Sequence, residues 1–203
     1  HTGQFGGEVF DVAAFAQQGL RVATEALELL AAPNCPSGVM DLILMPDQMM
    51  LQIHESIGHP LELDRILGDE RNYAGWSFVQ PSDFGSLRYG SPLMHVTFDP
   101  TKQNAMASYA FDDGGSPARR EFLIEGGVLK RGLGSVESQE RTGLPGVAGF
   151  RSSSWTRAPI DRMANVNLER GTSALDDMIA SVEDGILMST NRSWSIDDYR
   201  NKF

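Results

Sequence analysis

The chain has 203 residues, of which 41% are hydrophobic and 22% are charged, an ordinary composition for a globular protein with one core, or one domain and part of another. Its formal charge of −10, with no basic cluster longer than Arg119-Arg120, argues against a nucleic-acid surface, because binding to phosphates depends on clustered Lys and Arg. The single cysteine, Cys35, excludes an intrachain disulfide and fits a reducing compartment. No apolar run reaches the roughly 20 residues of a membrane-spanning helix. We therefore expect a cytoplasmic protein that contacts neither nucleic acid nor membrane.

The N-terminal part of the chain predicts a helix, a strand and a second helix. Apolar residues recur at helical spacing over residues 11–32 and predict a packed helix, which Gly19 could break. Prolines and a glycine follow, and they predict a boundary between the helical end of an N-terminal domain (residues 1–34) and a second domain (residues 35–203). A short run rich in branched apolar residues at 39–45 predicts a buried strand. Pro46-Asp47 then starts a helix, with Asp47 as its cap.

The remainder of the chain predicts more strands than helices. The expected strands cover residues 76–79, 95–98, 105–111, 121–124, 128–131 and 164–168. Gly126 and Gly127 form the hairpin turn between the fourth and fifth of these. Helical segments are expected at 63–72, at 135–141 and from a cap at Ser173 to about residue 184, with Met178 and Ile179 facing inward. Because the strands do not alternate regularly with helices, we predict an α+β fold with a mixed or antiparallel sheet.

The residue types that carry chemistry gather between positions 54 and 64. Two of the four histidines and three carboxylates lie in this stretch, which reads His54-Glu55-x-x-Gly58-His59-x-x-Glu62-x-Asp64. Neutral imidazole is a common zinc ligand, and a carboxylate beside a ligand can accept a proton from an activated water. The stretch therefore predicts a hydrolytic metal site.

The spacing of the two histidines differs from the familiar helical pattern H-E-x-x-H, in which they stand four residues apart and share a face. Five steps along a regular helix leave two side chains roughly 140° apart, too far for one metal ion. Glycine at position 58 tolerates a distorted backbone, and proline at position 60 ends the helix. We therefore expect His54 and Glu55 in the last turns of a helix and His59 at its distorted end.

With these residues the chain resembles the TldD/PmbA peptidases, whose metal-bearing members carry H-E-x-x-x-H followed by a short acidic stretch. The resemblance covers roughly residues 20–190. It includes Pro36-Ser37-Gly38, the hairpin at residues 122–130 and the segment Pro159-Ile160-Asp161-Arg162-Met163-Ala164-Asn165.

The resemblance implies a role for each residue of the motif. His54 and His59 would be zinc ligands, and Glu55 would be the general base that activates water. The third protein ligand of the family is a cysteine far downstream, whereas this chain ends at Phe203 without it and Cys35 lies before the motif. We therefore expect the sequence to be a fragment of a longer protein, without the C-terminal part of that protein. We expect this isolated fragment to be inactive.

The resemblance also implies a substrate and an assembly. Family members cleave short or unfolded peptides inside a dimer, which is a homodimer or a heterodimer with a related subunit that lacks the motif. The intact motif places this chain on the metal-bearing side.

Two questions stay open at this level. Glu62 and Asp64 could accept the second ring N–H of a ligand histidine, or they could equally cap a helix or form a salt bridge with Arg65. The chain could also be a catalytically inactive peptide-binding or scaffolding module of the same fold, as the missing third ligand suggests. A nucleic-acid-associated regulator is a third hypothesis, against which the acidic balance weighs.

Overall fold

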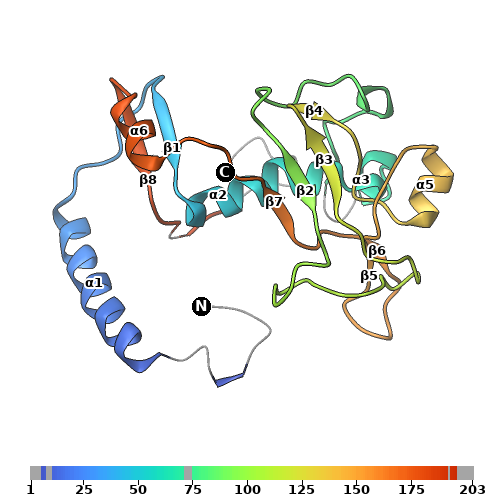
Figure 1. The fold of residues 1–203 in the computed structure, drawn as a ribbon, viewed down its shortest axis with the longest axis horizontal. Coiled ribbons are helices and arrows are strands. Elements are labelled where there is room, and N and C mark those ends of the chain that lie inside the picture. Colours follow the sequence, from blue (N-terminus) through green and yellow to red (C-terminus); the bar gives the residue numbers. More distant parts are fainter. Residues whose placement is uncertain (1–5, 8–10, 71–74, 192, 196–203) are drawn as a thin grey trace.

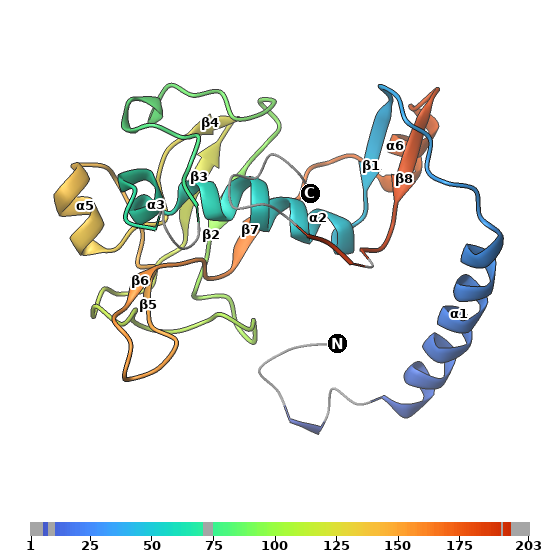
Figure 2. The same ribbon diagram turned by 180° about the vertical axis from the view of Figure 1, so that it is seen from behind.

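The computed structural model describes residues 6–7, 11–70, 75–191 and 193–195 (Figure 1). A main body contains a four-stranded sheet, a smaller unit contains a two-stranded sheet, and helix α2 (Pro46–Ile53) lies between them (Figures 1 and 2). Helix α1 (Val12–Ala31) extends away from both. The strands do not alternate regularly with helices, and the larger sheet is antiparallel, as the sequence predicted.

The four-stranded sheet has the order β4-β3-β2-β7. Its strands are β2 (Val96–Phe98), β3 (Glu121–Glu125), β4 (Val128–Leu129) and β7 (Val166–Leu168). The hairpin between β3 and β4 turns on Gly126 and Gly127, which have φ angles of 57° and 77°. Positive φ is favourable for glycine and costly for residues with a Cβ, so the Gly-Gly pair specifies this turn as expected.

The core lies between this sheet and the helical turns that carry the histidine motif. Ten apolar residues form it: Ile57, Leu61, Val79, Val96, Phe98, Leu123, Ile124, Leu129, Leu133 and Val147. Ile57 and Leu61 belong to the motif segment and are at most 6% exposed. Burying a side chain of this size stabilises a fold by roughly 1.5–3 kcal/mol, so the motif is anchored by its own apolar residues.

Helix α1 runs without interruption through Gly19, so the predicted break is wrong. The carboxylate of Asp11 accepts a hydrogen bond of 3.0 Å from the backbone N–H of Ala14 and caps the helix. A glycine inside a helix costs only about 1 kcal/mol, which the remaining turns outweigh. No residue of α1 is buried, and Leu30 is 84% exposed. The packing that its apolar stripe predicts is therefore not made by the described residues.

The smaller unit pairs strand β1 (Asp41–Leu44) in parallel with strand β8 (Gly185–Met188), next to helix α6 (Leu175–Ala180). The strand at β1 was predicted, but as a buried one, whereas Leu42 is 56% exposed. The N-cap of α6 is Ala174 and not Ser173, and Met178 and Ile179 are 42% and 43% exposed. Within the described residues, the prediction that the strand is buried and the prediction that Met178 and Ile179 face inward are therefore wrong.

Two of the predicted strands, at 76–79 and 105–111, are irregular segments instead. The hydroxyl of Ser77 donates to the carbonyl of Pro60 and accepts from the N–H of Val79, so it replaces the ladder hydrogen bonds of a strand. In the second segment the side-chain amide of Asn165 accepts from the N–H of Ala107. Such side-chain contacts compete with strand pairing and leave no periodic signal in the sequence.

The remaining elements are short. Helix α3 spans Leu63–Leu67 and ends at Gly68, whose φ is 89°, earlier than the predicted 63–72, of which residues 71 and 72 lie outside the described part. Helix α5 (Val136–Thr142) is capped by Ser135, close to the helical turn expected there. Strands β5 (Phe150–Arg151) and β6 (Ile160–Asp161) form a two-stranded sheet that the sequence did not predict, and Pro81–Asp83 is a 3₁₀ turn, η4. Among the helices of the described residues, none combines the length and the apolar composition needed to cross a bilayer.

Candidate metal centre

Helix α2 leads directly into the histidine motif. Pro46 occupies its first turn, where a missing N–H costs nothing, and the N-cap is Met45. Asp47 therefore does not cap the helix as predicted. It lies in the first turn, where a negative charge interacts favourably with the helix dipole.

The backbone changes its winding at the motif. After α2, residues His54–Gly58 form a single π-helical turn, η2, followed by a 3₁₀ turn, η3, over His59–Leu61. The backbone N–H of His59 donates to the backbone carbonyl of His54, which closes a turn of five residues. In this wider turn, residues five apart lie close to the same face. His54 and His59 therefore share a face, which a regular helix would not allow.

Gly58 and Pro60 are the residues from which this distortion was expected, and each has a local role. A Cβ at position 58 would lie 1.9 Å from the sulfur of Met163, so only glycine lets that side chain approach. Pro60 lies in the 3₁₀ turn and cannot continue the helix. The hydroxyl of Tyr89 donates to the carbonyl of Ser56 at 2.7 Å, and this hydrogen bond joins the π-helical turn to the segment that follows η4.

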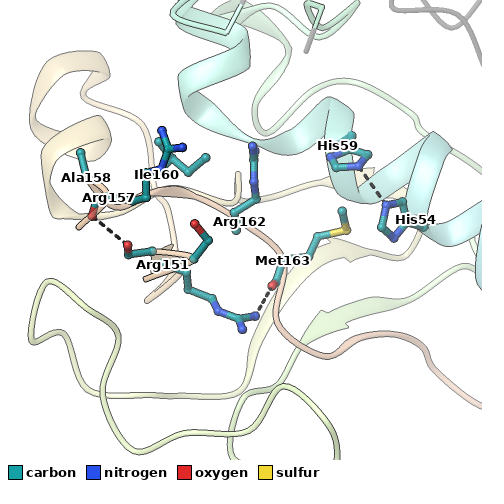
Figure 3. Close-up of a pocket in the computed structure, with 10 residues that line it drawn as sticks. His54, His59, Arg151, Arg157, Ala158, Ile160, Arg162 and Met163 are labelled. Atoms are coloured by element: carbon teal, nitrogen blue, oxygen red, sulfur yellow. Dashed lines mark hydrogen bonds between the residues drawn. The ribbon is translucent and has the colours of Figure 1, made fainter. Parts of the chain in front are cut away.

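The two imidazoles of the motif meet edge to face. Their Nε2 atoms are 2.9 Å apart, and the ring planes stand at 84° (Figure 3). A carboxylate oxygen of Glu55 lies 3.8 Å from Nε2 of His54. One ligand atom from each of these three residues lies within 4.8 Å of the others. The Glu55 side chain is 6% exposed, whereas that of His54 is half exposed and accessible from the pocket.

Glu62 makes two of the contacts that the sequence left open for it, one with a histidine of the motif and one with Arg65. Its Oε2 atom lies 3.0 Å from Nδ1 of His59, and it also accepts hydrogen bonds from Arg65 and from Arg162. Nη2 of Arg65 lies 3.2 Å from the same Nδ1, so the tautomer of His59 decides which group donates in these contacts. With the proton on Nδ1, His59 donates to Glu62 and the lone pair of Nε2 is available to a metal. This is the tautomer that binds a metal through Nε2.

Asp64 does not contact either histidine. Its carboxylate accepts from the N–H of Asp161, and the N–H of Asp64 donates to the carboxylate of Asp161 at 3.1 Å. Burial, together with the charges of Asp161 and Glu62, raises the pKa of Asp64 to about 7. The contacts of Asp64 that the structure describes are therefore with Asp161, and they tie α3 to β6.

Arg162 is a residue of the site for which the sequence predicted no role. It donates to Glu62 and to Glu70, each at 3.2 Å, and it lines a pocket of about 890 Å³ together with both histidines. The segment at 159–165 contributed to the resemblance, but nothing local in it indicates a contact with residue 62. Figure 3 shows Arg162 and Met163 between the histidines and the far wall of the pocket.

The donor set of this cluster fits zinc. Two imidazole nitrogens at about 2.0–2.1 Å from a tetrahedral zinc ion would stand about 3.3 Å apart, close to the 2.9 Å between the Nε2 atoms. The orientation of His59 by a buried carboxylate is the arrangement commonly found behind zinc ligands. The residues present therefore fit a zinc ion held by His54 and His59.

Fold and site together describe an α+β protein with a candidate hydrolytic metal centre, and the comparisons with known proteins agree. Residues 37–203 match the family model described as PmbA/TldA metallopeptidase C-terminal domain. The chain therefore belongs to the TldD/PmbA metallopeptidase family.

Relatives with assigned names support this membership. The metalloprotease MJ0996 of Methanocaldococcus jannaschii is 29% identical over 100% of this chain and 43% of its own length. The metalloprotease TldD homolog of Haemophilus influenzae is 29% identical over 93% of this chain and 37% of its own length. The chain thus spans less than half the length of these relatives.

A solved structure supports the fold. TldE from Thermococcus kodakarensis superimposes with a TM-score of 0.62 at 19% identity, over 79% of this chain and 35% of its own. At that identity the likeness concerns the arrangement of helices and strands.

Proposed function

We propose that this protein is a zinc-dependent peptidase in which His54 and His59 hold the metal and Glu55 is the general base. The observation that carries the proposal is the pair of Nε2 atoms 2.9 Å apart with the buried Glu55 carboxylate beside them. Names of relatives that include "metalloprotease" support the same reaction class. The third protein ligand in this proposal is a cysteine outside these 203 residues.

Each residue of the site has a part in the proposed reaction. A zinc ion bound here supplies Lewis acidity, which polarises a peptide carbonyl and makes water a better acid. Glu55 takes the proton of the attacking water and passes it to the leaving amine, and its near-complete burial keeps the carboxylate from competing solvent. Glu62 keeps His59 in the binding tautomer.

The proposed substrates are short or unfolded peptides in extended conformation. In the order β4-β3-β2-β7, β7 is an outer strand of the described sheet, and it begins at Val166, shortly after Arg162 and Met163 of the pocket. An extended peptide can add to such an edge through its backbone, which requires little recognition of side chains.

The wider organisation is part of the proposal. Residues 1–34 would be the end of a neighbouring domain, which would cover the exposed apolar stripe of α1, and residues 35–203 would belong to the peptidase domain. The protein would work in the cytoplasm as a homodimer or as a heterodimer with a related subunit that lacks the motif. The isolated 203-residue chain would be inactive.

A second candidate is an inactive peptide-binding module. It is favoured by one observation: the described residues supply two imidazoles, whereas catalytic zinc usually has three protein ligands. The two candidates differ in whether the full-length protein hydrolyses peptides.

The test is the metal content of the full-length protein, by elemental analysis, beside its Glu55→Gln and His54→Ala variants, with peptide cleavage assayed on each. The proposal expects about one zinc per chain, retained in Glu55→Gln while cleavage is lost, and both zinc and cleavage lost in His54→Ala. If the metal-loaded full-length protein cleaves no peptide, the peptidase proposal is contradicted, and the inactive peptide-binding module remains as the candidate function.

A further inference from the structure

We propose that the pocket beside the two histidines binds a carboxylate group of the peptide substrate through Arg151 and Arg157. The inference rests on the proposed peptidase function and adds a preference to it. Peptides that carry a free C-terminal carboxylate, or an Asp or Glu side chain, close to the cleaved bond would be favoured.

The pocket lining has a charge opposite to that of the chain. Three arginines line the pocket with His54 and His59, and no Asp or Glu is among its described lining residues. The chain as a whole has a formal charge of −10. A concentration of positive charge inside a cleft of an acidic protein attracts anions to that cleft.

The three arginines are not equivalent, because Arg162 is already paired. Its guanidinium donates to the carboxylates of Glu62 and Glu70, each at 3.2 Å. Two carboxylates balance its charge, and its contact with Glu62 belongs to the support of His59. Arg162 therefore positions the site, and the charge available to a ligand comes from the other two arginines.

Arg151 is held in place by groups without a net charge. Its Nη1 donates to the carbonyl of Met163 at 2.9 Å (Figure 3). The guanidinium also lies 5.8 Å from the ring centre of Tyr109. A carbonyl and an aromatic face orient a guanidinium but do not neutralise it. Arg151 lines the pocket and makes no ion pair with a carboxylate in the described part of the chain, so its guanidinium is available to a ligand.

Arg157 lies on an ordered loop at the opposite side of the pocket from the histidines (Figure 3). The hydroxyl of Ser152 donates to the carbonyl of Arg157 at 2.8 Å and so closes the loop. Asp113 lines a neighbouring pocket with Arg157, and its carboxylate accepts from the N–H of Ser152. No ion pair joins Asp113 to Arg157 within the described part of the chain, so the guanidinium can bind a ligand.

The ligand chemistry follows from the guanidinium groups. Their planar N–H donors match the two oxygens of a carboxylate and bind them bidentately. For a peptide, this carboxylate has two sources: the free C-terminus and an acidic side chain. Both place a negative charge at the wall away from the histidines while the peptide bond lies near them.

The experiment uses the full-length protein and one peptide sequence prepared in three forms. The forms are a free C-terminal acid with an internal Gln, a C-terminal amide with the same Gln, and a C-terminal amide with Glu in its place. We expect one of the two charged forms to exceed the neutral form at least about fivefold in kcat/KM, mainly through KM. Whichever form does so identifies the source of the carboxylate.

The matched variants are Arg157→Gln, Arg151→Gln and Arg119→Gln. Arg157 is exposed, so its replacement leaves the fold intact even if Arg151→Gln disturbs it. A fall in kcat/KM for the favoured charged peptide that is at least about fivefold larger than the fall for the neutral peptide in Arg157→Gln supports the inference. Arg119 is exposed and outside the pocket, and its variant is expected to keep the preference.

Failure of this inference and failure of the proposed function give different results. Equal cleavage of all three peptides by the wild-type protein overturns the carboxylate site and leaves the peptidase standing. If no peptide is cleaved, anisotropy of the labelled peptides on the Glu55→Gln protein decides. Equal affinity for the three forms overturns the inference, and tighter binding of a charged form, lost in Arg157→Gln, supports it.

Discussion

Oε2 of Glu62 lies 3.0 Å from Nδ1 of His59, and the Glu62 side chain is completely buried. Arg65 and Arg162 donate to the same oxygen, one from the same helical segment and one from a residue 100 positions away. The orientation of His59 therefore depends on a carboxylate whose place is determined by two guanidinium groups.

We predict that Glu62→Gln weakens zinc binding by about 10- to 100-fold, because the glutamine no longer offers a charged acceptor to the N–H of His59 and leaves two arginines without their carboxylate. The measurement is competition for zinc with a chelator in the full-length protein. Glu140→Gln removes the same charge from an exposed position of α5 and serves as control. An affinity equal to that of the control would show that His59 is held in another way.

Replacement of Gly58 by alanine is expected to destabilise the protein by about 1–3 kcal/mol, because the new Cβ would lie 1.9 Å from the sulfur of Met163. Unfolding in denaturant measures the change. Gly171→Ala is the control, since a Cβ there meets no atom within 4 Å. The double variant with Met163→Ala should recover part of the loss. If Gly58→Ala unfolds like the wild type, the close approach is not present in solution.

The stability of the metal-free protein should fall as pH rises from about 4 to about 7, in part because of Asp64. Its pKa is raised to about 7 in the folded state from an ordinary value of 3.8, with burial as the main cause. The unfolded chain therefore loses this proton at lower pH than the folded protein. The contribution of the protonated group is complete below about pH 4 and is lost as pH rises through 7.

Asp64→Asn should remove on the order of 2–4 kcal/mol of this pH dependence, as measured by urea unfolding across the same range. Asp69→Asn should act with the opposite sign, because the hydrogen bond from Arg141 holds the pKa of Asp69 below its ordinary value. An unchanged pH slope in Asp64→Asn would mean that Asp64 is charged in the folded protein.

The exposed stripe of α1 provides a test of the proposed domain boundary. If another part of the full-length protein covers this stripe, Leu30→Ser should destabilise that protein by about 1.5–3 kcal/mol, although Leu30 is 84% exposed among the described residues. Glu28→Ser is the control, because two residues of helix place it about 200° away, on the polar face. Equal unfolding curves for the two variants would show that no other part of the protein covers the stripe at Leu30.

Several features could be predicted from sequence because neighbouring residues cause them. The five-residue spacing of His54 and His59, with Gly58 and Pro60, predicted a distorted helix end, and the π-helical and 3₁₀ turns are that distortion. Gly126-Gly127 predicted the hairpin turn for the same kind of reason, since positive φ angles are a property of single residues.

Other features required the tertiary structure. The strand pair β1–β8 joins distant segments in parallel, and the partner strand was missed because such pairing needs no local turn signal. The strand predicted at 105–111 failed because the distant side chain of Asn165 bonds to its backbone.

The sequence by itself determined which residues could bind a metal and how the backbone must bend to bring His54 and His59 together, because spacing, glycine and proline act within one or two helical turns. Tertiary structure decided which groups support them. Arg162 reaches Glu62 across 100 positions, and Asp64 pairs with Asp161 across 97. Contacts between such distant residues arise only when the chain packs its core, so no local pattern records them.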